Sequence, residues 1–172
     1  RSFCFVIIAI PEGERAELID GKMYMMAPPS YLHQTLCMEL SATIRDYIRS
    51  HNGSCQVLPS LLAVNLQADD TTYVEPDISV VCDRSKINPK GISGAPDFIV
   101  EIVSPSSRKM DYITKNTLYS EAGVREYWIV DPPRRQTTIY RYEEDAAPMI
   151  VPFDQPLTVG IYGDLQITIA EL

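Results

Sequence analysis

Two acidic clusters hold the residues of this sequence that are best suited to chemistry. Asp77 directly precedes the apolar run 78–81, and Asp97 and Glu101 lie in the apolar run 97–103. Each run has the composition of a buried strand, and a buried carboxylate is costly unless it is paired or binds a metal. Two such carboxylates on neighbouring strands would form a site for a hard cation, and sites of this kind hydrolyse phosphodiesters.

The geometry of a strand selects which two acids share the cation. Asp97 and Glu101 point to the same face of one strand, but four residues of strand span about 13 Å, and each ligand of magnesium binds at roughly 2.0–2.1 Å. Asp77 opens a different strand. We therefore predict that Asp77 and Glu101 bind the metal, with carboxylates within about 6 Å of each other on neighbouring strands. The Ile102 carbonyl would add a third oxygen, and Asp97 is interpreted as a turn residue after Pro96.

A positively charged side chain near the scissile phosphate would complete the site. A lysine two residues after Glu101 would stand on the same strand face, but position 103 is Val103. The next candidates are Arg108, Lys109 and Lys115. We predict that Lys115 has this role, because a residue in the first turns of a helix that follows the strand can lean back over the strand's end. Its ammonium would hold a water molecule and offset phosphate charge.

A purely structural interpretation of these residues stays open. An aspartate after a proline is common in turns. A single buried glutamate can also simply form an ion pair with a lysine. In that case the same residues would stabilise the fold and carry no chemistry.

The pattern of apolar residues predicts the elements that position these side chains. Leucine or isoleucine recurs every four residues and predicts an amphipathic helix over 31–50, with Ser30 as its N-cap. The other expected elements are a hairpin over 16–26, a second helix over 109–122, a loop over 88–96, and strands over 56–67, 78–82, 97–103, 126–130, 136–142, 149–151 and 165–169. The strand, helix and strand between 97 and 130 indicate a crossover. The expected class is therefore α/β or α+β with a central mixed sheet.

Length and charge restrict the interpretation further. The chain has 172 residues, and we expect residues 1–172 to form a single domain. The net charge of −8 by itself argues against a nucleic-acid partner, since non-specific binding to DNA depends on neutralising phosphates. The charge is uneven, however, because the segment 84–115 holds six basic residues against three acidic ones. A locally basic face around an acidic site is compatible with this distribution.

The cysteines and the apolar N-terminal run concern location. The four cysteines form no Cys-x-x-Cys pair, and we interpret them as reduced thiols of a cytoplasmic protein. The run 3–10 is far too short to span a bilayer and is interpreted as a strand. We expect no membrane partner.

Several longer strings resemble one known family. They are AELIDGKMYMMAPPSYLHQTL, EPDISVV, GAPDFIVEIVSPSS and DYITKNTLYSEAGVREYWIVDP, and the resemblance covers residues 14–142. These strings resemble the Uma-type family of restriction endonuclease-like proteins, formerly a domain of unknown function, within the PD-(D/E)XK nuclease superfamily. The resemblance implies a restriction endonuclease-like fold, with a central mixed β-sheet flanked by helices.

The resemblance also implies roles for individual residues. The metal-binding aspartate of the superfamily falls on Asp77 and its second acid on Glu101. The usual lysine would fall on position 103, and members of this family place it on the following helix, which matches Lys115. Many nucleases of the superfamily draw a further acid from an early helix, for which Glu39 is the candidate and Glu17 the rival. His33 resembles a recurrent family position, but a histidine at a helix start is more often a cap or a packing residue.

The expected function is a Mg²⁺-dependent (or Mn²⁺-dependent) endonuclease that cuts DNA. The alternative is a non-catalytic module with a nuclease fold that binds nucleic acid or another protein, since fold does not settle function. Cutting both strands of a duplex takes two active sites, so we expect a homodimer. Strand edges over 3–10 and 137–142 would be exposed in a monomer, which favours the same conclusion.

Overall fold

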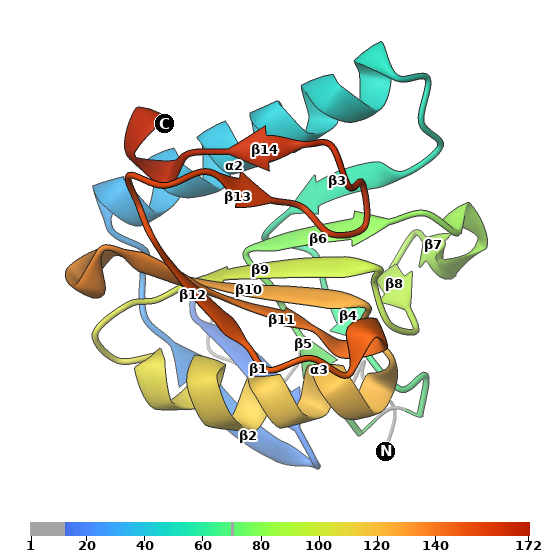
Figure 1. Cartoon of the computed structure of the whole chain (residues 1–172). Coiled ribbons are helices and arrows are strands. Elements are labelled where there is room, and N and C mark those ends of the chain that lie inside the picture. The colour runs from blue at the N-terminus through green and yellow to red at the C-terminus, as the bar shows by residue number, and fades with distance from the viewer. Residues whose placement is uncertain (1–12, 70) are drawn as a thin grey trace.

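A mixed β-sheet runs through the middle of the molecule (Figure 1). The computed structural model describes residues 13–69 and 71–172, so the strand expected over 3–10 lies outside the described residues. Within the described part, six strands form this central sheet in the order β12-β11-β10-β9-β6-β3. Their bounds are Gln56–Pro59 for β3, Ile78–Val81 for β6, Phe98–Ile102 for β9, Glu126–Asp131 for β10, Gln136–Arg141 for β11 and Met149–Pro152 for β12.

The centre of this sheet consists of its most apolar strands. β9 and β10 are parallel, with Val100 opposite Trp128, and β6 is antiparallel to β9, with Ile78 opposite Val100. A parallel pair needs a crossover connection. Here the crossover contains a π-helical segment, η2 (Met110–Lys115), which continues into α3 (Asn116–Ala122). The mixed sheet and the strand–helix–strand crossover are thus confirmed, and part of the second helix is π-helical.

The helix α2 (Tyr31–Ser50) covers one face of the central sheet (Figure 1). It begins after Ser30, whose Oγ accepts a hydrogen bond from the backbone N–H of His33 at 3.2 Å, as an N-cap does. The buried residues of its inner face are Leu36, Cys37, Leu40, Ile44 and Ile48. The C-terminal hairpin, with β13 (Leu157–Thr158) and β14 (Gln166–Ile167), joins the same core. No helix of the described residues is long and apolar enough to cross a membrane.

The opposite face is covered by η2, α3 and a second sheet. In the described part this sheet has the order β2-β1-β5-β4-β8-β7. Its strands are Arg15–Ile19 for β1, Lys22–Met26 for β2, Val64–Asn65 for β4, Tyr73–Val74 for β5, Ile87–Asn88 for β7 and Gly91–Ser93 for β8. The expected hairpin over 16–26 is β1 and β2. The segment 88–96, expected to be a loop, contains the short strand β8.

Side chains along β9 alternate between the two cores. Phe98, Val100 and Ile102 pack in the core with α2, whereas Ile99 packs in the core with α3. Glu101 has the parity of Ile99, so its carboxylate points to the side of η2 and α3. The strand period therefore decides on which side of the sheet a site can form.

Two expectations from the sequence are wrong. Cys55 and Cys82 form a disulfide and are not reduced thiols, because the antiparallel pairing of β3 with β6 brings them opposite each other. Cys37 is a free, buried thiol. The edge expected over 137–142 is covered for half of its length, since β11 pairs with β10 on one side and, over residues 136–139, with β12 on the other. Neither contact is visible in the sequence, because both depend on which strands become neighbours.

Candidate active site

Asp77 and Glu101 lie on neighbouring strands, as expected. In the register of β6 and β9, Ile78 faces Val100, so Asp77 and Glu101 come next to each other at the same end of the two strands. Residues directly opposite on antiparallel strands point to the same face. Both are buried, with exposed fractions of 8% for Asp77 and 4% for Glu101. The pairing of strands thus brings the two predicted acids together at one end of the central sheet.

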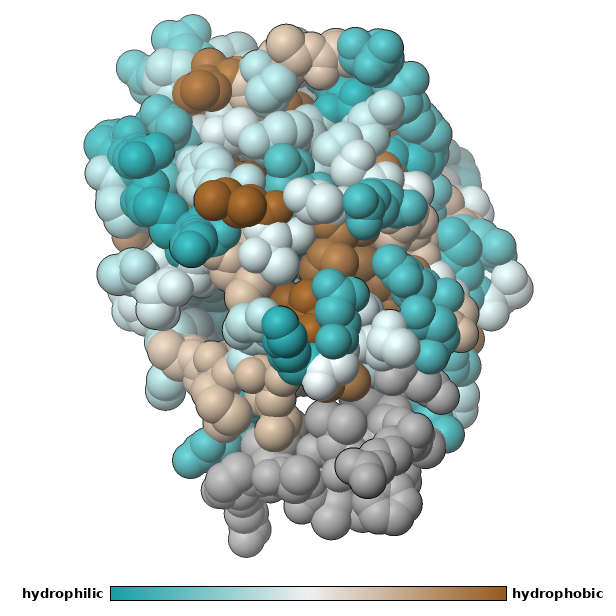
Figure 2. Space-filling view, turned by 90° about the horizontal axis from the view of Figure 1, so that it is seen from below, coloured by the Kyte–Doolittle hydropathy of each residue, from teal (hydrophilic) through white to brown (hydrophobic). Residues whose placement is uncertain are grey.

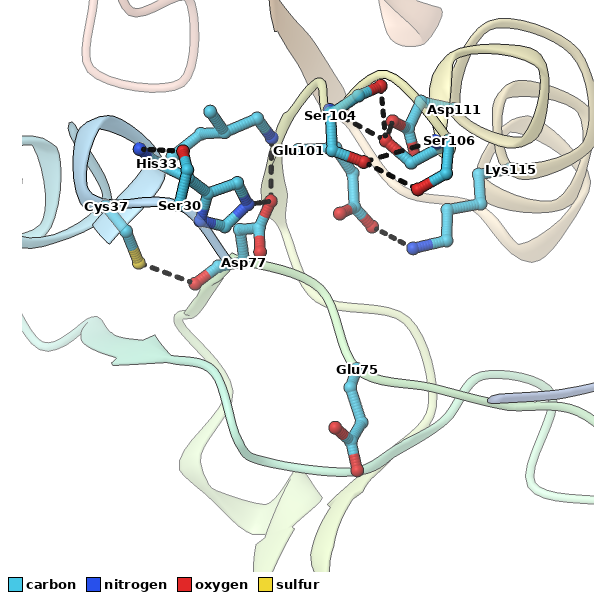
Figure 3. A network of polar contacts seen from close by, with 12 residues as sticks. Ser30, His33, Cys37, Glu75, Asp77, Glu101, Ser104, Ser106, Asp111 and Lys115 are labelled. Atoms are coloured by element: carbon cyan, nitrogen blue, oxygen red, sulfur yellow. Dashed lines mark hydrogen bonds and ion pairs between the residues drawn. The ribbon is translucent and has the colours of Figure 1, made fainter. Parts of the chain in front are cut away.

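Asp77 is held firmly by backbone and side-chain groups (Figure 3). Its Oδ2 accepts a hydrogen bond from the backbone N–H of Ile102 at 2.7 Å and lies 3.0 Å from His33 Nε2. Its carbonyl oxygen accepts from the thiol of Cys37 at 3.3 Å and from the backbone N–H of Ser60 at 2.9 Å. Among the described residues Oδ1 has no hydrogen-bond partner, so this oxygen is available to a ligand.

Glu101 meets a lysine and a tyrosine with the same oxygen. Its Oε1 accepts hydrogen bonds from Lys115 Nζ at 2.8 Å and from the Tyr119 hydroxyl at 2.6 Å. Burial raises the pKa of Glu101 well above its usual value, Lys115 opposes this shift, and the neighbouring acids Asp77, Asp111 and Glu17 add to it. Oε2 has no hydrogen-bond partner within the described part of the chain, and so remains free for a ligand.

Lys115 lies between two carboxylates. Its Nζ is 2.8 Å from Glu101 Oε1 and 2.9 Å from Glu17 Oε1, and the side chain is buried. Burial lowers the pKa of Lys115, but the negative charges of Glu101, Glu17 and Asp111 outweigh it and hold the pKa well above the usual value. The lysine is therefore charged at neutral pH. The contact with Glu101 that the sequence predicted is confirmed.

The π-helical segment explains how Lys115 reaches this place. Asp111, Lys115 and Tyr119 are spaced four residues apart along η2 and α3, and all three are buried. A π-helical turn is wider than an α-helical turn, and such turns are frequent at functional sites. The spacing brings Lys115 and Tyr119 to the same oxygen of Glu101. The helical segment that follows β9 thus supplies the positively charged side chain that the strand itself lacks.

Asp111 is a residue of this site that the sequence reasoning did not select. Its Oδ2 accepts a hydrogen bond from Ser107 Oγ at 2.6 Å, and its carbonyl oxygen accepts from the Tyr127 hydroxyl at 3.1 Å. Burial raises the pKa of Asp111 to about 6, against the opposing effects of Lys115 and of the Ser107 hydrogen bond. The spacing of four residues between Asp111 and Lys115 on a predicted helix was the available signal.

A cavity of about 260 Å³ connects these groups. Asp77, Glu101, Lys115, Asp111 and Glu17 all line it, together with residues from β2 and from the loop after β9. The cavity therefore joins residues from both sheets and from η2, which are remote from one another in the sequence.

Asp97, Glu39 and Arg108, the other candidates from the sequence, do not line this cavity. Asp97 accepts a hydrogen bond from the backbone N–H of Cys82 at 2.8 Å and does not share a site with Glu101. Glu39 is exposed on α2 and does not line the cavity, whereas its rival Glu17 does. Arg108 pairs with Asp131 through two hydrogen bonds of 2.5 and 2.9 Å.

The donor set fits a hard divalent cation. No three His, Cys, Asp or Glu side chains of the described residues are grouped closely enough to hold a metal ion by themselves. Mg²⁺ does not require such a group, since it keeps several waters and binds through one or two carboxylates. Asp77 and Glu101 each offer one oxygen without a protein partner, and oxygen ligands suit Mg²⁺ or Mn²⁺ rather than a softer metal.

The sequence of this chain matches one known protein family over nearly its whole length. The family model described as "Uma2: Putative restriction endonuclease" matches residues 4–170. An uncharacterized protein of Synechocystis sp., slr1290, is 26% identical over 135 residues, which cover 78% of this chain and 70% of that protein. The crystal structure of a nuclease belonging to DUF820 from Anabaena variabilis, itself described as putative, has a TM-score of 0.75 at 23% identity. That match covers 96% of this chain and 93% of the other, and it shows a shared fold.

The family match spans both sheets, both flanking helical layers and every residue of the buried acid and lysine cluster. It agrees with the central mixed sheet and with the family resemblance found in the sequence strings. The chain therefore belongs to the Uma2 family.

Proposed function

We propose that this chain is a metal-dependent nuclease that hydrolyses phosphodiester bonds of DNA. The observation that carries the proposal is the convergence of Asp77, Glu101 and Lys115 in one cavity of a chain whose family carries the description "Putative restriction endonuclease". Two buried acids with free oxygens can hold a divalent cation, and one charged lysine can offset phosphate charge, as metal-dependent phosphodiester hydrolysis can use. A merely structural ion pair would not need Asp77 in the same cavity.

Each residue of the cluster has a distinct part in this proposal. Asp77 Oδ1 and Glu101 Oε2 would hold the cation, which when bound supplies charge stabilisation and activates water. Lys115 has three N–H donors, of which Glu101 and Glu17 take two. The third is left for a water molecule or for a phosphate oxygen. Tyr119 fixes the orientation of Glu101 by its hydrogen bond to Oε1.

The test is cleavage of supercoiled plasmid with Mn²⁺ by the wild type and by Asp77→Asn. Asparagine retains the shape of Asp77 and an oxygen for the Ile102 N–H, but it is a poor cation ligand. We expect the rate to fall roughly 100-fold or more, the size of loss typical for a group that stabilises transition-state charge. Glu39→Gln, which removes an exposed acid outside the cavity, serves as the matched control and should cleave like the wild type.

A non-catalytic module is the second candidate, and one observation favours it. Two carboxylates already neutralise Lys115, and the chain has a net charge of −8. A wild type that fails to nick plasmid with Mg²⁺ or with Mn²⁺, but whose melting temperature rises with Mn²⁺, would favour this candidate. Equal cleavage by wild type and Asp77→Asn would count against the site itself.

The homodimer is a further part of the proposal. β12 covers β11 over residues 136–139, so the strand edge there gives no support for a dimer. What supports a dimer is the need for two sites to cut both strands of a duplex at one place. Light scattering that gives a mass near 19.4 kDa at micromolar protein would show a monomer. A monomer could nick duplexes or cut single strands.

A further inference from the structure

The basic residues of the cavity lining are already paired with acids. Within the described lining, the Arg15 guanidinium contacts Glu75 Oε2 at 3.1 and 2.7 Å, and His33 Nε2 lies 3.0 Å from Asp77 Oδ2. Lys115 is paired with Glu101 as described above. Affinity for duplex DNA depends chiefly on unpaired Lys and Arg that neutralise phosphates. The lining offers little positive charge of this kind, so binding of a substrate must draw on other contacts.

One part of the lining is apolar and aromatic. It consists of the end of β2 and the residues that follow, and we call it the apolar lining: Tyr24, Met25, Met26, Ala27, Pro28 and Pro29. Tyr24 and Met25 are 37% and 54% exposed although they lie in a strand, and among the described strands β2 is an outer one of its sheet. Figure 2 views the molecule from the side of β2 and α3, and hydrophobic residues gather there between hydrophilic ones. Exposed aromatic and thioether groups beside a catalytic cavity can stack on flat, apolar ligands.

Another part of the lining offers hydroxyl groups. Ser104 and Ser106 from the loop after β9 line the cavity, with their Oγ atoms 3.3 Å apart (Figure 3). Ser107 also lines it, but its hydroxyl is already donated to Asp111. Hydroxyls can donate hydrogen bonds to phosphate oxygens without charge. The lining therefore combines a surface suited to bases with neutral donors suited to the backbone.

We propose that the cavity takes an unpaired nucleic-acid strand, with one base stacked on Tyr24, which lies opposite Glu17 on the same face of the sheet, and the adjoining phosphate directed to Asp77 and Glu101. This inference rests on the proposed function and specifies its substrate class. A duplex covers the faces of its bases by stacking, whereas an unpaired strand leaves them free, and base–aromatic stacking tolerates any sequence. The cavity volume of about 260 Å³ lies just below the range of pockets for small ligands, about 300–1,000 Å³, and so suits about one nucleotide.

The test measures binding apart from cleavage. Asp77→Asn serves as the background, and fluorescence anisotropy with Mn²⁺ compares a labelled DNA strand of about 16 nucleotides, the upper end of known site sizes, with its duplex. We expect the strand to bind about 10-fold more tightly than the duplex, the effect of stacking one base. Tyr24→Ala should remove most of this preference, and Tyr24→Phe, which retains the ring, should preserve it.

A matched control is Tyr31→Ala in the same background. Tyr31 is 87% exposed at the start of α2 and does not line the cavity, so its removal should leave the affinity for the strand unchanged. The melting temperature of each variant shows that the fold is retained. Light scattering of Tyr24→Ala shows whether the same residues serve instead as a contact between copies of this chain.

Several results would overturn the inference. They are a duplex bound as tightly as the strand, no binding of either form, unchanged strand binding in Tyr24→Ala, or a change of oligomeric state in that variant without a change in binding. Cleavage of duplex alone by the wild type would leave the proposed function in place and refute this inference. Strand binding that depends on Tyr24, with no cleavage by the wild type, would support the binding of an unpaired strand and refute the proposed nuclease function.

Discussion

At the scale of single residues, the site is a set of buried charges that depend on one another. Lys115 is the only positive group in contact with both Glu101 and Glu17 among the described residues. The part proposed for it in cleavage and its part in stability therefore cannot be separated. Because all three groups are buried, removing the lysine affects stability as well as any chemistry at the site.

Replacing Lys115 should both abolish cleavage and destabilise the fold. Lys115→Ala leaves two buried carboxylates without their partner, and breaking a buried ion pair typically costs about 3–5 kcal/mol. Urea unfolding at pH 7 measures this loss. Adding Glu17→Gln to Lys115→Ala removes one of the two unpaired carboxylate charges and should restore part of the stability. A Lys115→Ala variant as stable as the wild type would show that the ion pairs are absent.

Asp111 should make stability depend on pH. Its pKa is raised by burial to about 6 in the fold, above the value near 3.9 of an unfolded chain. A raised carboxyl pKa favours the fold fully below about pH 4, and this contribution is lost as the pH rises through 6. By pH 8 the loss is about 3 kcal/mol. Lys115 and Ser107 oppose the shift, while Asp77 and Glu17 add to it.

Asp111→Asn removes this titration. The free energy of unfolding, measured by urea at a series of pH values from 4 to 8, should fall less steeply with pH in the variant than in the wild type. Asparagine can still accept the hydrogen bond from Ser107. Parallel pH profiles for the two proteins would mean that Asp111 ionises as it does in water.

At the scale of elements, the segment η2 and the first turn of α2 position charged side chains of the site. The π-helical segment η2 carries Lys115, and the first turn of α2 carries His33, whose ring contacts Asp77. Ser30 caps that first turn through the N–H of His33. The position of Asp77 therefore depends partly on how well the start of α2 is formed.

Removing the cap should affect both the helix and the site. Ser30→Ala should cost about 1 kcal/mol of unfolding free energy, the usual effect of losing an N-cap, while Ser30→Asp should retain it. Cleavage should fall in Ser30→Ala, since His33 becomes less ordered. Ser50→Ala at the other end of the same helix is the control and should leave cleavage unchanged. Cleavage equal to wild type in Ser30→Ala would show that His33 does not need its cap.

At the scale of the whole molecule, the central sheet is cross-linked at β3, an outer strand within the described part of the chain. The disulfide Cys55–Cys82 joins β3 to the end of β6, the strand that Asp77 opens, across 27 residues of sequence. A disulfide that closes a loop of this size typically stabilises a fold by about 3 kcal/mol. The reduced thiols expected from the sequence would not provide this.

Reduction should therefore lower the stability of the protein. Denaturation with and without dithiothreitol should give a lower urea midpoint in the reduced sample, and thiol titration of the unfolded chain should find two more thiols after reduction. Cys55→Ser/Cys82→Ser should behave like the reduced wild type under both conditions. The same number of thiols before and after reduction would show that the two cysteines are not joined.

The sequence by itself determined the main elements and the two acids. The four-residue spacing of apolar side chains predicted α2, and the apolar runs predicted β6, β9 and β10, because helix and strand periods are properties of local sequence. Strand length excluded Asp97 as the partner of Glu101. The choice of Lys115 also came from the order of elements along the chain, since a helix must follow β9 before the chain can return to the sheet.

Tertiary structure alone decided the rest of the site. Glu17 and Glu39 were indistinguishable in the sequence, and the packing of the second sheet against η2 placed Glu17 beside Lys115 while α2 left Glu39 in solvent. The pairing of β3 with β6 joined Cys55 to Cys82, and β12 covered the edge of β11. Periodicity shows which face a side chain occupies, but the neighbours on that face depend on long-range strand pairing, which no local pattern records.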